Sequence, residues 1–203
     1  MLFTKKKRFS VTDKSIKEDI LDANGDILIK INVRYPEIQC NERDPLNHNA
    51  VKFYKRIAES FAHSAKQDMA KTAEERKKSD IDFVPFSAVM RWSKTFESDD
   101  FLGFVIEFSV WDGKGKQSIE RKTQVWERKF GTKCRFNYFF ESKILKETFT
   151  LSDKEKKSFD KELFALCENG FEFYLKGENG YKTYSLPLSA SKIDIVTKNV
   201  GSV

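Results

Sequence analysis

The stretch that decides the fold is Phe101-Leu102-Gly103-Phe104-Val105-Ile106-Glu107-Phe108-Ser109-Val110-Trp111. Its five even positions, from Leu102 to Val110, are all large and apolar. Because side chains on a strand alternate between its two faces, these five line one face of a sheet. The odd positions mix apolar residues with Glu107 and Ser109. The pattern therefore predicts a central strand with one face on the main core and the other partly covered.

Elements of both types are predicted around this strand. Asn24-Gly25 is a hairpin signal of type I′ between residues 16–22 and 27–35. Apolar residues then recur at spacings of three and four, which predicts a long helix over residues 47–78. Ser152 with Glu155 fits a capping box at the start of a second helix, 152–168. The remaining predicted strands cover residues 81–96, 118–129, 134–140, 171–175 and 181–188.

These elements predict an α+β fold, in which an antiparallel sheet, a meander plus hairpins, packs against one long and one shorter helix. The apolar stripe of the long helix, including Phe61, is expected on the sheet face that carries Leu102 and Phe108. A chain of 203 residues can bury a core without disulfides or metal. We expect a basic flexible tail over residues 1–14, a single domain over 15–196 and a C-terminal tail over 197–203.

Positive charge is concentrated in one segment of the chain. The net charge is +6, and residues 113–135 alone hold eight basic and two acidic residues, an excess of six. A basic surface can attract an acidic protein, nucleic acid, anionic lipid or an anionic glycan. The alternative is that these charges only keep an exposed hairpin soluble and unpaired.

The predicted binding site lies on this hairpin. Trp is enriched among the residues that dominate interface energetics, and basic residues beside it are typical of surfaces that bind anions. An acidic protein is the expected partner, with nucleic acid or an anionic glycan as alternatives, since no recognised nucleic-acid motif is present. The predicted site residues are Lys114, Lys116, Arg121, Lys122 and Trp126.

Catalytic, metal and membrane functions have little support in the sequence. Three cysteines, Cys40, Cys134 and Cys167, lie far apart without ligand spacing, so neither zinc nor another cofactor is expected. Residues 113–116 lack the spacing of a phosphate-binding loop, and no nucleophile motif occurs. Glu107 is read as paired with Arg121 or Lys122, although a buried carboxylate could act as an acid or base. Without a signal peptide or an apolar run of membrane-spanning length, the chain is expected to be cytoplasmic. Because the sequence shows no nucleophile–base or metal-ligand set, we do not expect an enzyme.

Several short motifs in order carry a family resemblance. They are Asp-x-Asn-Gly-Asp (22–26), Tyr-Pro-Glu-Ile (35–38), Phe-Tyr-x-x-Ile-Ala-Glu-Ser-Phe (53–61), Phe-Val-Ile-Glu-Phe-Ser-Val (104–110), Gly-x-x-x-x-Phe-x-x-Phe-Phe (131–140), Phe-Glu-Phe-Tyr-Leu (171–175) and Tyr-x-x-Tyr-Ser-Leu-Pro-Leu (181–188). Over residues 15–196 the chain resembles the RsiV-type domain of unknown function, DUF3298. That family typically carries Gly-Gly-Ala-His-Gly in the turn after the central strand, whereas residues 112–118 here contain no His.

The resemblance implies a binding role more than a chemical one. The best-known member of the family senses lysozyme outside the cell as part of an anti-sigma factor, and the domain also accompanies some cell-wall polysaccharide deacetylases. We therefore expect a non-catalytic ligand- or protein-binding domain with a sensor or regulatory role. The alternatives are an accessory hydrolase linked to cell-wall polysaccharide metabolism, or a weak nucleic-acid binder that uses the basic hairpin.

Overall fold

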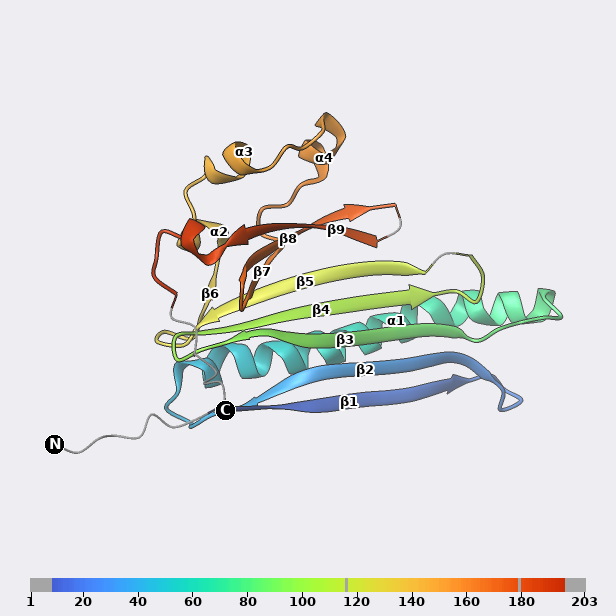
Figure 1. Cartoon of the computed structure of the whole chain (residues 1–203). Helices are drawn as coiled ribbons and strands as arrows, with labels where there is room; N and C mark the ends of the chain where they lie inside the picture. Colours follow the sequence, from blue (N-terminus) through green and yellow to red (C-terminus); the bar gives the residue numbers. More distant parts are fainter. Residues whose placement is uncertain (1–8, 116, 179, 196–203) are drawn as a thin grey trace, which may run out of the picture. The chain divides into compact units, whose positions relative to one another are not determined.

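A computed structural model describes residues 9–115, 117–178 and 180–195 of the chain. Strands β1 (Ser10–Leu21) and β2 (Ile27–Gln39) lead through a π-helical turn (Asn47–Val51) into the long helix α1 (Lys52–Ser79) (Figure 1). Four strands follow: β3 (Phe86–Glu97), β4 (Phe101–Trp111), β5 (Ser118–Glu127) and β6 (Thr132–Cys134). The rest comprises short helices α2 (Phe136–Phe139), α3 (Ile144–Thr148) and α4 (Asp153–Ser158), strands β7 (Phe164–Cys167), β8 (Gly170–Gly177) and β9 (Gly180–Pro187), and a 3₁₀ turn (Leu188–Ala190).

The strands form two sheets. The larger has the order β1-β2-β3-β4-β5-β6, and the smaller has the order β7-β8-β9. β4 therefore lies inside the larger sheet, as its pattern predicts. β1 and β2 are antiparallel, but β2 and β3 are parallel, with Ile29 opposite Phe86. A parallel pair needs a crossover connection, and α1 supplies it. The α+β class is thus confirmed, while the larger sheet is mixed and not wholly antiparallel.

The chain divides into two compact units. Unit 1 extends to Trp92 and includes Ile106–Glu120, while unit 2 contains Ser93–Val105 and the chain from Arg121 onward. The division crosses β3, β4 and β5, so no loop or change of composition marks it in the sequence.

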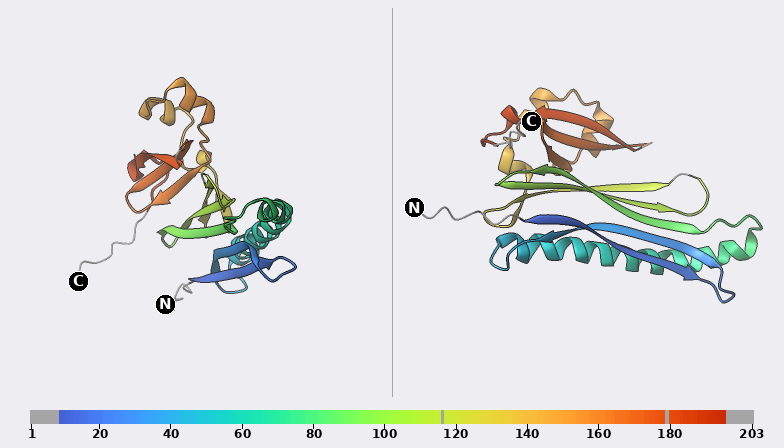
Figure 2. Two further views of the ribbon diagram at one scale, coloured as in Figure 1. Left: turned by 90° about the vertical axis from the view of Figure 1, so that its right-hand side faces the viewer. Right: turned by 60° about the horizontal axis from the view of Figure 1, so that its bottom comes forward.

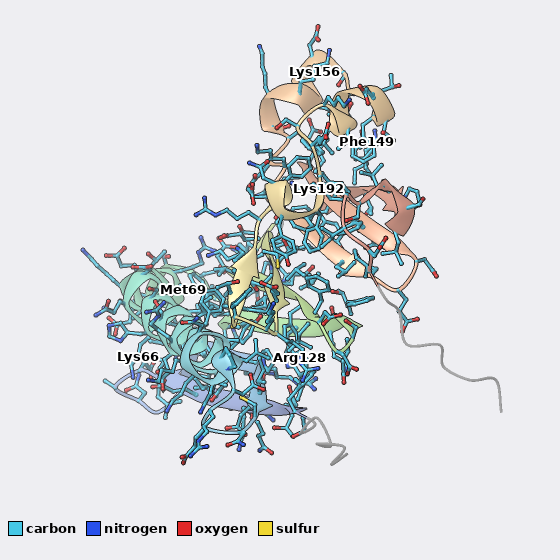
Figure 3. The ribbon with its side chains drawn as sticks, turned by 90° about the vertical axis from the view of Figure 1, so that its left-hand side faces the viewer. Lys66, Met69, Arg128, Phe149, Lys156 and Lys192 are labelled. Carbon is cyan, nitrogen blue, oxygen red and sulfur yellow. The ribbon has the colours of Figure 1, made fainter. Side chains whose placement is uncertain are left out.

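In unit 1, α1 packs on β2, as the two views in Figure 2 show. Ile29, Ile31 and Val33 of β2 are at most 2% exposed, and they alternate with exposed polar residues. Phe61, at the edge of the helical stripe, packs edge-on against Phe108 of β4 at 5.1 Å between ring centroids. Figure 3 labels Met69 in this stripe and Lys66 on the same helix. The buried helical residues are Tyr54, Ala58, Ala62, Ala65, Met69 and Ala73.

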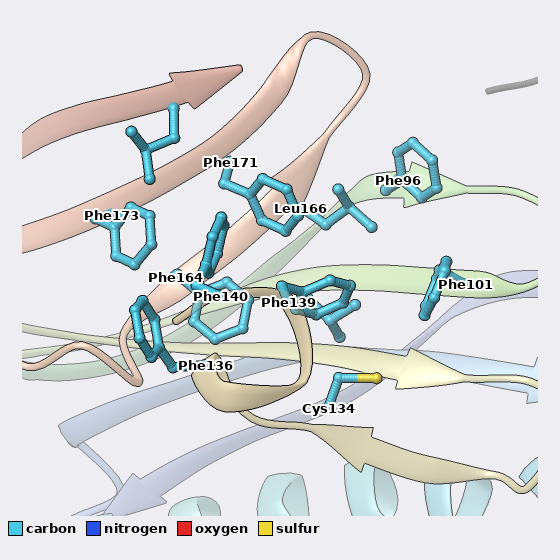
Figure 4. Packing of buried hydrophobic residues seen from close by; sticks show 12 residues of the cluster. Phe96, Phe101, Cys134, Phe136, Phe139, Phe140, Phe164, Leu166, Phe171 and Phe173 are labelled. Atoms are coloured by element: carbon cyan, nitrogen blue, oxygen red, sulfur yellow. The ribbon is translucent and has the colours of Figure 1, made fainter. Parts of the chain in front are cut away.

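Unit 2 has a core built largely of phenylalanine, as Figure 4 shows. The ring of Phe139 lies within 5.0–6.2 Å of five other aromatic rings, centroid to centroid. Aromatic rings prefer tilted and edge-on contacts of this kind. The buried members of the cluster are Phe96, Phe101, Val125, Cys134, Phe136, Phe139, Phe140, Phe164, Leu166, Phe171, Phe173 and Leu186.

Some predicted boundaries are wrong. The capping box at Ser152 is present, but α4 ends at Ser158 because residues 164–167 pair with β8. The predicted second helix is therefore one of three short helices. The predicted strand 134–140 stops at Cys134. The predicted tail, 1–14, overlaps β1 from Ser10 onward; residues 1–8 and the predicted C-terminal tail, 197–203, lie outside the described residues.

We predict that Phe139→Ala lowers the free energy of unfolding of unit 2 by about 3–5 kcal/mol, because a buried aromatic ring leaves a cavity when removed. Phe139 is fully buried, whereas Phe130 is 59% exposed, so Phe130→Ala is the matched control. Urea unfolding followed by circular dichroism measures both variants. Equal losses for the two variants would contradict the packing described for Phe139.

A pH dependence is predicted for the cap of α4. Hydrogen bonds from Lys182, Ser152 and Tyr184 lower the pKa of Glu155 to about 2, from an ordinary value of 4.5. Because the folded pKa is depressed, the stabilisation is present above about pH 4.5 and is lost as pH falls toward 2. Glu155→Gln should therefore be less stable than the parent protein at pH 6, and the difference should shrink between pH 4.5 and 2. Thermal unfolding at each pH tests this, and a pH-independent difference would contradict it.

Candidate functional site

Three loops of unit 1, residues 22–26, 80–85 and 112–115, meet at the C-terminal end of α1 (Figure 1), and we call these loops together with the last turn of α1, residues 76–79, the loop end. Arg76 and Lys77, in the last turn of α1, hold two of the loops. Lys77 Nζ lies 2.6 Å from a carboxylate oxygen of Asp22 and 2.6 Å from one of Asp26. Arg76 Nη1 donates to the carbonyl oxygen of Asp112 at 2.6 Å and to its carboxylate at 2.8 Å.

The β1–β2 turn is ordered by its own side chains. Asp22 Oδ1 accepts hydrogen bonds from the backbone N–H groups of Asn24 and Asp26, both at 2.9 Å. The hydrogen bond from Lys77, with these backbone bonds, holds the pKa of Asp22 below its usual value. The hairpin is confirmed, but its turn is not type I′. A type I′ turn needs a positive φ at both central residues. Here Gly25 has φ 88°, whereas none of the described non-glycine residues, Asn24 included, has a positive φ.

The β4–β5 turn is docked against the segment that follows α1. Lys114 forms an ion pair with Asp80, and its hydrogen bond is the main reason that the pKa of Asp80 is lowered. Gly113 has φ 83°, and a Cβ there would lie 2.6 Å from the carbonyl oxygen of Val84. Only glycine fits such a position without displacement of the backbone.

The structure places the five predicted site residues in different environments. Lys114 is in unit 1, while Arg121, Lys122 and Trp126 are in the part of β5 that belongs to unit 2. Lys116 lies outside the described residues. Lys122 is exposed. Trp126 is only 4% exposed, so the prediction that it is a surface aromatic anchor is wrong. Residues 123–126 are all buried, which means that both faces of β5 are covered there.

Arg121 is engaged by aromatic rings. Its guanidinium carbon lies 4.6 Å from the ring centroid of Tyr174 and 4.8 Å from that of Tyr181. Its backbone N–H donates to the hydroxyl oxygen of Tyr181 at 2.8 Å. Cation–π contacts of this kind stabilise the fold. Arg121 therefore joins β5 to β8 and β9, and its charge is directed at least in part inward.

A group of cations in unit 2 includes residues that the prediction omitted, and we call Lys122, Lys133 and Arg135 the basic face. Lys133 lies opposite Trp126 in the β5–β6 ladder, and the three side chains are exposed. Burial lowers the pKa of Lys133, and the charges of Arg135 and Lys122 lower it further, against the opposing effect of Glu162 and Asp160. The attraction of Glu162 and Asp160 thus acts on Lys133 more strongly than the repulsion of Arg135 and Lys122.

A fourth cation, Lys161, comes from a distant segment, and its Nζ lies 5.4 Å from the ring centroid of Phe136. Phe136 belongs to α2, directly after Arg135, so Lys161 lies in the neighbourhood of the basic face. A count of charges along the chain includes Lys133 and Arg135, but it does not show that a residue from outside the hairpin joins them.

The chemistry available to catalysis is limited in the described part of the chain. Burial raises the pKa of the Cys134 and Cys167 thiols to about 12, which keeps both protonated near neutral pH. Within residues 9–115, 117–178 and 180–195, no three His, Cys, Asp or Glu side chains form a group that could hold a metal ion. Of the helices found there, none is both long and apolar enough to span a membrane.

Comparison with known proteins shows that the fold is shared with solved structures. Residues 23–115 match the family model described as deacetylase PdaC. A DUF3298 family protein from Bacteroides fragilis has the same fold, with a TM-score of 0.53 and 12% identity over 89% of this chain and 91% of that one. A DUF3298 family protein from Pseudomonas aeruginosa PAO1 gives a TM-score of 0.51 and 9% identity over 90% of this chain and 94% of the other. No curated protein sequence matches the chain.

The resemblance drawn from the sequence is therefore confirmed: the fold is that of the DUF3298 structures. The match to the PdaC model begins in the β1–β2 turn and ends in the β4–β5 turn. These are the two turns that Lys77 and Arg76 bind, so the loop end, apart from Asp22, lies within the matched segment.

We predict that Gly113→Ala destabilises unit 1 more than Gly115→Ala. A left-handed backbone costs about 1–2 kcal/mol for a residue with a Cβ, so both substitutions carry that cost. Gly115 has φ 69° but open space around it, whereas Gly113 also faces Val84. Urea unfolding of the two variants should show the larger loss for Gly113→Ala. Equal losses would mean that the turn is not docked on Val84.

Proposed function

We propose that this protein is a non-catalytic binding domain with a sensor or regulatory role, and that it recognises an acidic protein through the basic face. The observation that carries the proposal is the presence of three exposed cations, Lys122, Lys133 and Arg135, in one part of unit 2, where the charges of Lys122 and Arg135 act on Lys133. An acidic partner would add Coulomb attraction at these cations to that which Glu162 and Asp160 already supply at Lys133.

The register of β5 and β6 supports one binding surface. Lys133 lies opposite Trp126, and Lys122 is an even number of residues from Trp126 on the same strand, so the two lysines share a face of the sheet, on which Gln124 and Trp126 are buried. Arg135 follows β6 directly. Within the residues that the structure describes, neither Lys133 nor Arg135 forms a salt bridge. Exposed cations of this kind steer an oppositely charged partner and accelerate its association.

The proposed surface differs from the predicted one. Lys122 stays in the proposed contact set. Lys114 is paired with Asp80 and Arg121 contacts two tyrosine rings, so these two side chains stabilise the fold. Trp126 supports the strand from inside. Lys133 and Arg135 replace these residues in the proposed contact set.

The name of the family model favours one competing function. That model is described as a deacetylase, and a hydrolytic role linked to cell-wall polysaccharides would require turnover of a substrate. Glu107, half-buried on β4, is the carboxylate that the sequence offers for such chemistry. A screen of glycan, ester and phosphate substrates separates the functions: turnover that Glu107→Gln abolishes would favour the hydrolase and overturn the proposal.

The binding proposal predicts that the triple variant Lys122→Glu, Lys133→Glu and Arg135→Glu loses its acidic partner. The matched control is Lys17→Glu, Lys52→Glu and Lys71→Glu, because it reverses three exposed cations of unit 1 and changes the net charge equally. A pull-down from nuclease-treated lysate of the source cell should recover the partner with the parent protein and the control, but not with the triple variant. Binding should weaken steeply as salt rises.

Two outcomes would contradict this proposal. If the control loses the partner as completely as the triple variant, net charge and not the basic face determines binding. If nuclease treatment alone removes the partner, the ligand is a nucleic acid. Circular dichroism spectra that match the parent protein's show that each variant is folded before it is compared.

A further inference from the structure

A pocket of about 350 Å³ lies between the β1–β2 turn and the last two turns of α1. Residues 22–24 form one wall, and Glu74, Lys77 and Lys78 form the other; Leu28, which is almost fully buried, also lines the pocket. All of these residues belong to unit 1, whereas those of the basic face belong to unit 2. Its volume is near the lower end of the range for small-molecule sites.

The pocket is formed before any ligand arrives. The ammonium of Lys77 joins Asp22 and Asp26, and Asp22 in turn accepts two backbone hydrogen bonds from its own turn. Only 15% of the Asp22 side chain and 25% of the Lys77 side chain is exposed. A wall fixed in this way lowers the entropy that a ligand would lose on binding.

Two opposite charges at the pocket do not neutralise each other. Glu74 and Lys78 are exposed and one helical turn apart, in the order that favours an ion pair along a helix. In the described chain, neither side chain forms a hydrogen bond or an ion pair. Elsewhere on α1, Lys55 pairs with Glu59 and Lys71 pairs with Glu75, at 3.8 and 3.9 Å. The carboxylate and the ammonium at the pocket are thus available to a ligand.

We propose that this pocket binds a small zwitterion of dipeptide size. Its ammonium contacts Glu74 and its carboxylate contacts Lys78. Side chains four residues apart on a helix have Cβ atoms about 5–6 Å apart, and two extended residues span up to about 7 Å, so the charge spacings match. Lys77 does not compete for the carboxylate, because two aspartates already neutralise it.

The dipeptide alanyl-leucine is the test ligand, added to the whole ¹⁵N-labelled protein while amide chemical shifts are recorded. Saturable shifts are expected at residues 22–28 and 74–78, with a dissociation constant in the range of about 1 mM. A capped analogue, acetylated at the N-terminus and amidated at the C-terminus, lacks both charges and should bind at least about tenfold more weakly.

Matched variants test the two charges. Glu74→Gln and Lys78→Gln should each weaken binding roughly fivefold, as the loss of one partly exposed ion pair does. Glu75→Gln is the control, because Glu75 is the next residue and pairs with Lys71 outside the pocket. The double exchange Glu74→Lys with Lys78→Glu should restore binding, since the zwitterion can reverse its direction.

Three results would overturn the inference. They are the absence of saturable shifts at residues 22–28 and 74–78, equal binding of the capped analogue, and an equal loss for Glu75→Gln and Glu74→Gln. Failure here leaves the acidic-partner proposal unaffected, because the two experiments use different units, different variants and different ligands.

Discussion

Two consecutive cations at the end of α1 organise unit 1. Successive residues on a helix point about 100° apart, so Arg76 and Lys77 reach different loops from neighbouring positions. Lys77 binds the β1–β2 turn through Asp22 and Asp26, and Arg76 binds the β4–β5 turn through Asp112. Arg76 also lies 5.1 Å from the ring centroid of Phe86, at the start of β3. Cations are favoured at a helix C-terminus because the helix dipole is negative there. The same two side chains also contact the β1–β2 turn, the β4–β5 turn and the start of β3.

The sequence predicts elements well where one periodicity is sustained. The long helix, the first hairpin and β4 all repeat their pattern over many residues, and each is present. The segment 159–167 fits two periodicities: Phe159, Leu163 and Leu166 suit a helix, whereas Phe164 and Leu166 alternate as on a strand. Pairing of Phe164 with Phe173 determines the outcome, and such a long-range contact leaves no local signal. The parallel pairing of β2 with β3 is likewise decided by how α1 crosses the sheet.

The candidate site was predictable only as a concentration of charge. The sequence shows where cations gather, but it does not show which partners they meet. Lys114 meets Asp80, and Arg121 meets Tyr174 and Tyr181, residues more than 30 positions away in each case. Trp126 was misplaced because its strand carries polar residues at its start yet is covered on both faces near its end. Lys122 is the predicted residue that remains on an exposed surface next to other cations.

The β4–β5 turn, which differs from the family's usual motif, has a structural role in this protein. Where the resembling family carries a histidine, this chain has Asp112, Gly113 and Lys114, and all three are directed at unit 1 itself: at Arg76, at Val84 and at Asp80. The charges of this turn are therefore used within the fold. Those left at this end for a ligand are Glu74 and Lys78, unlike charges held apart, whereas the basic face of unit 2 brings like charges together. The two arrangements differ in kind, and for that reason we propose a different kind of ligand for each, a zwitterion in unit 1 and an acidic protein in unit 2.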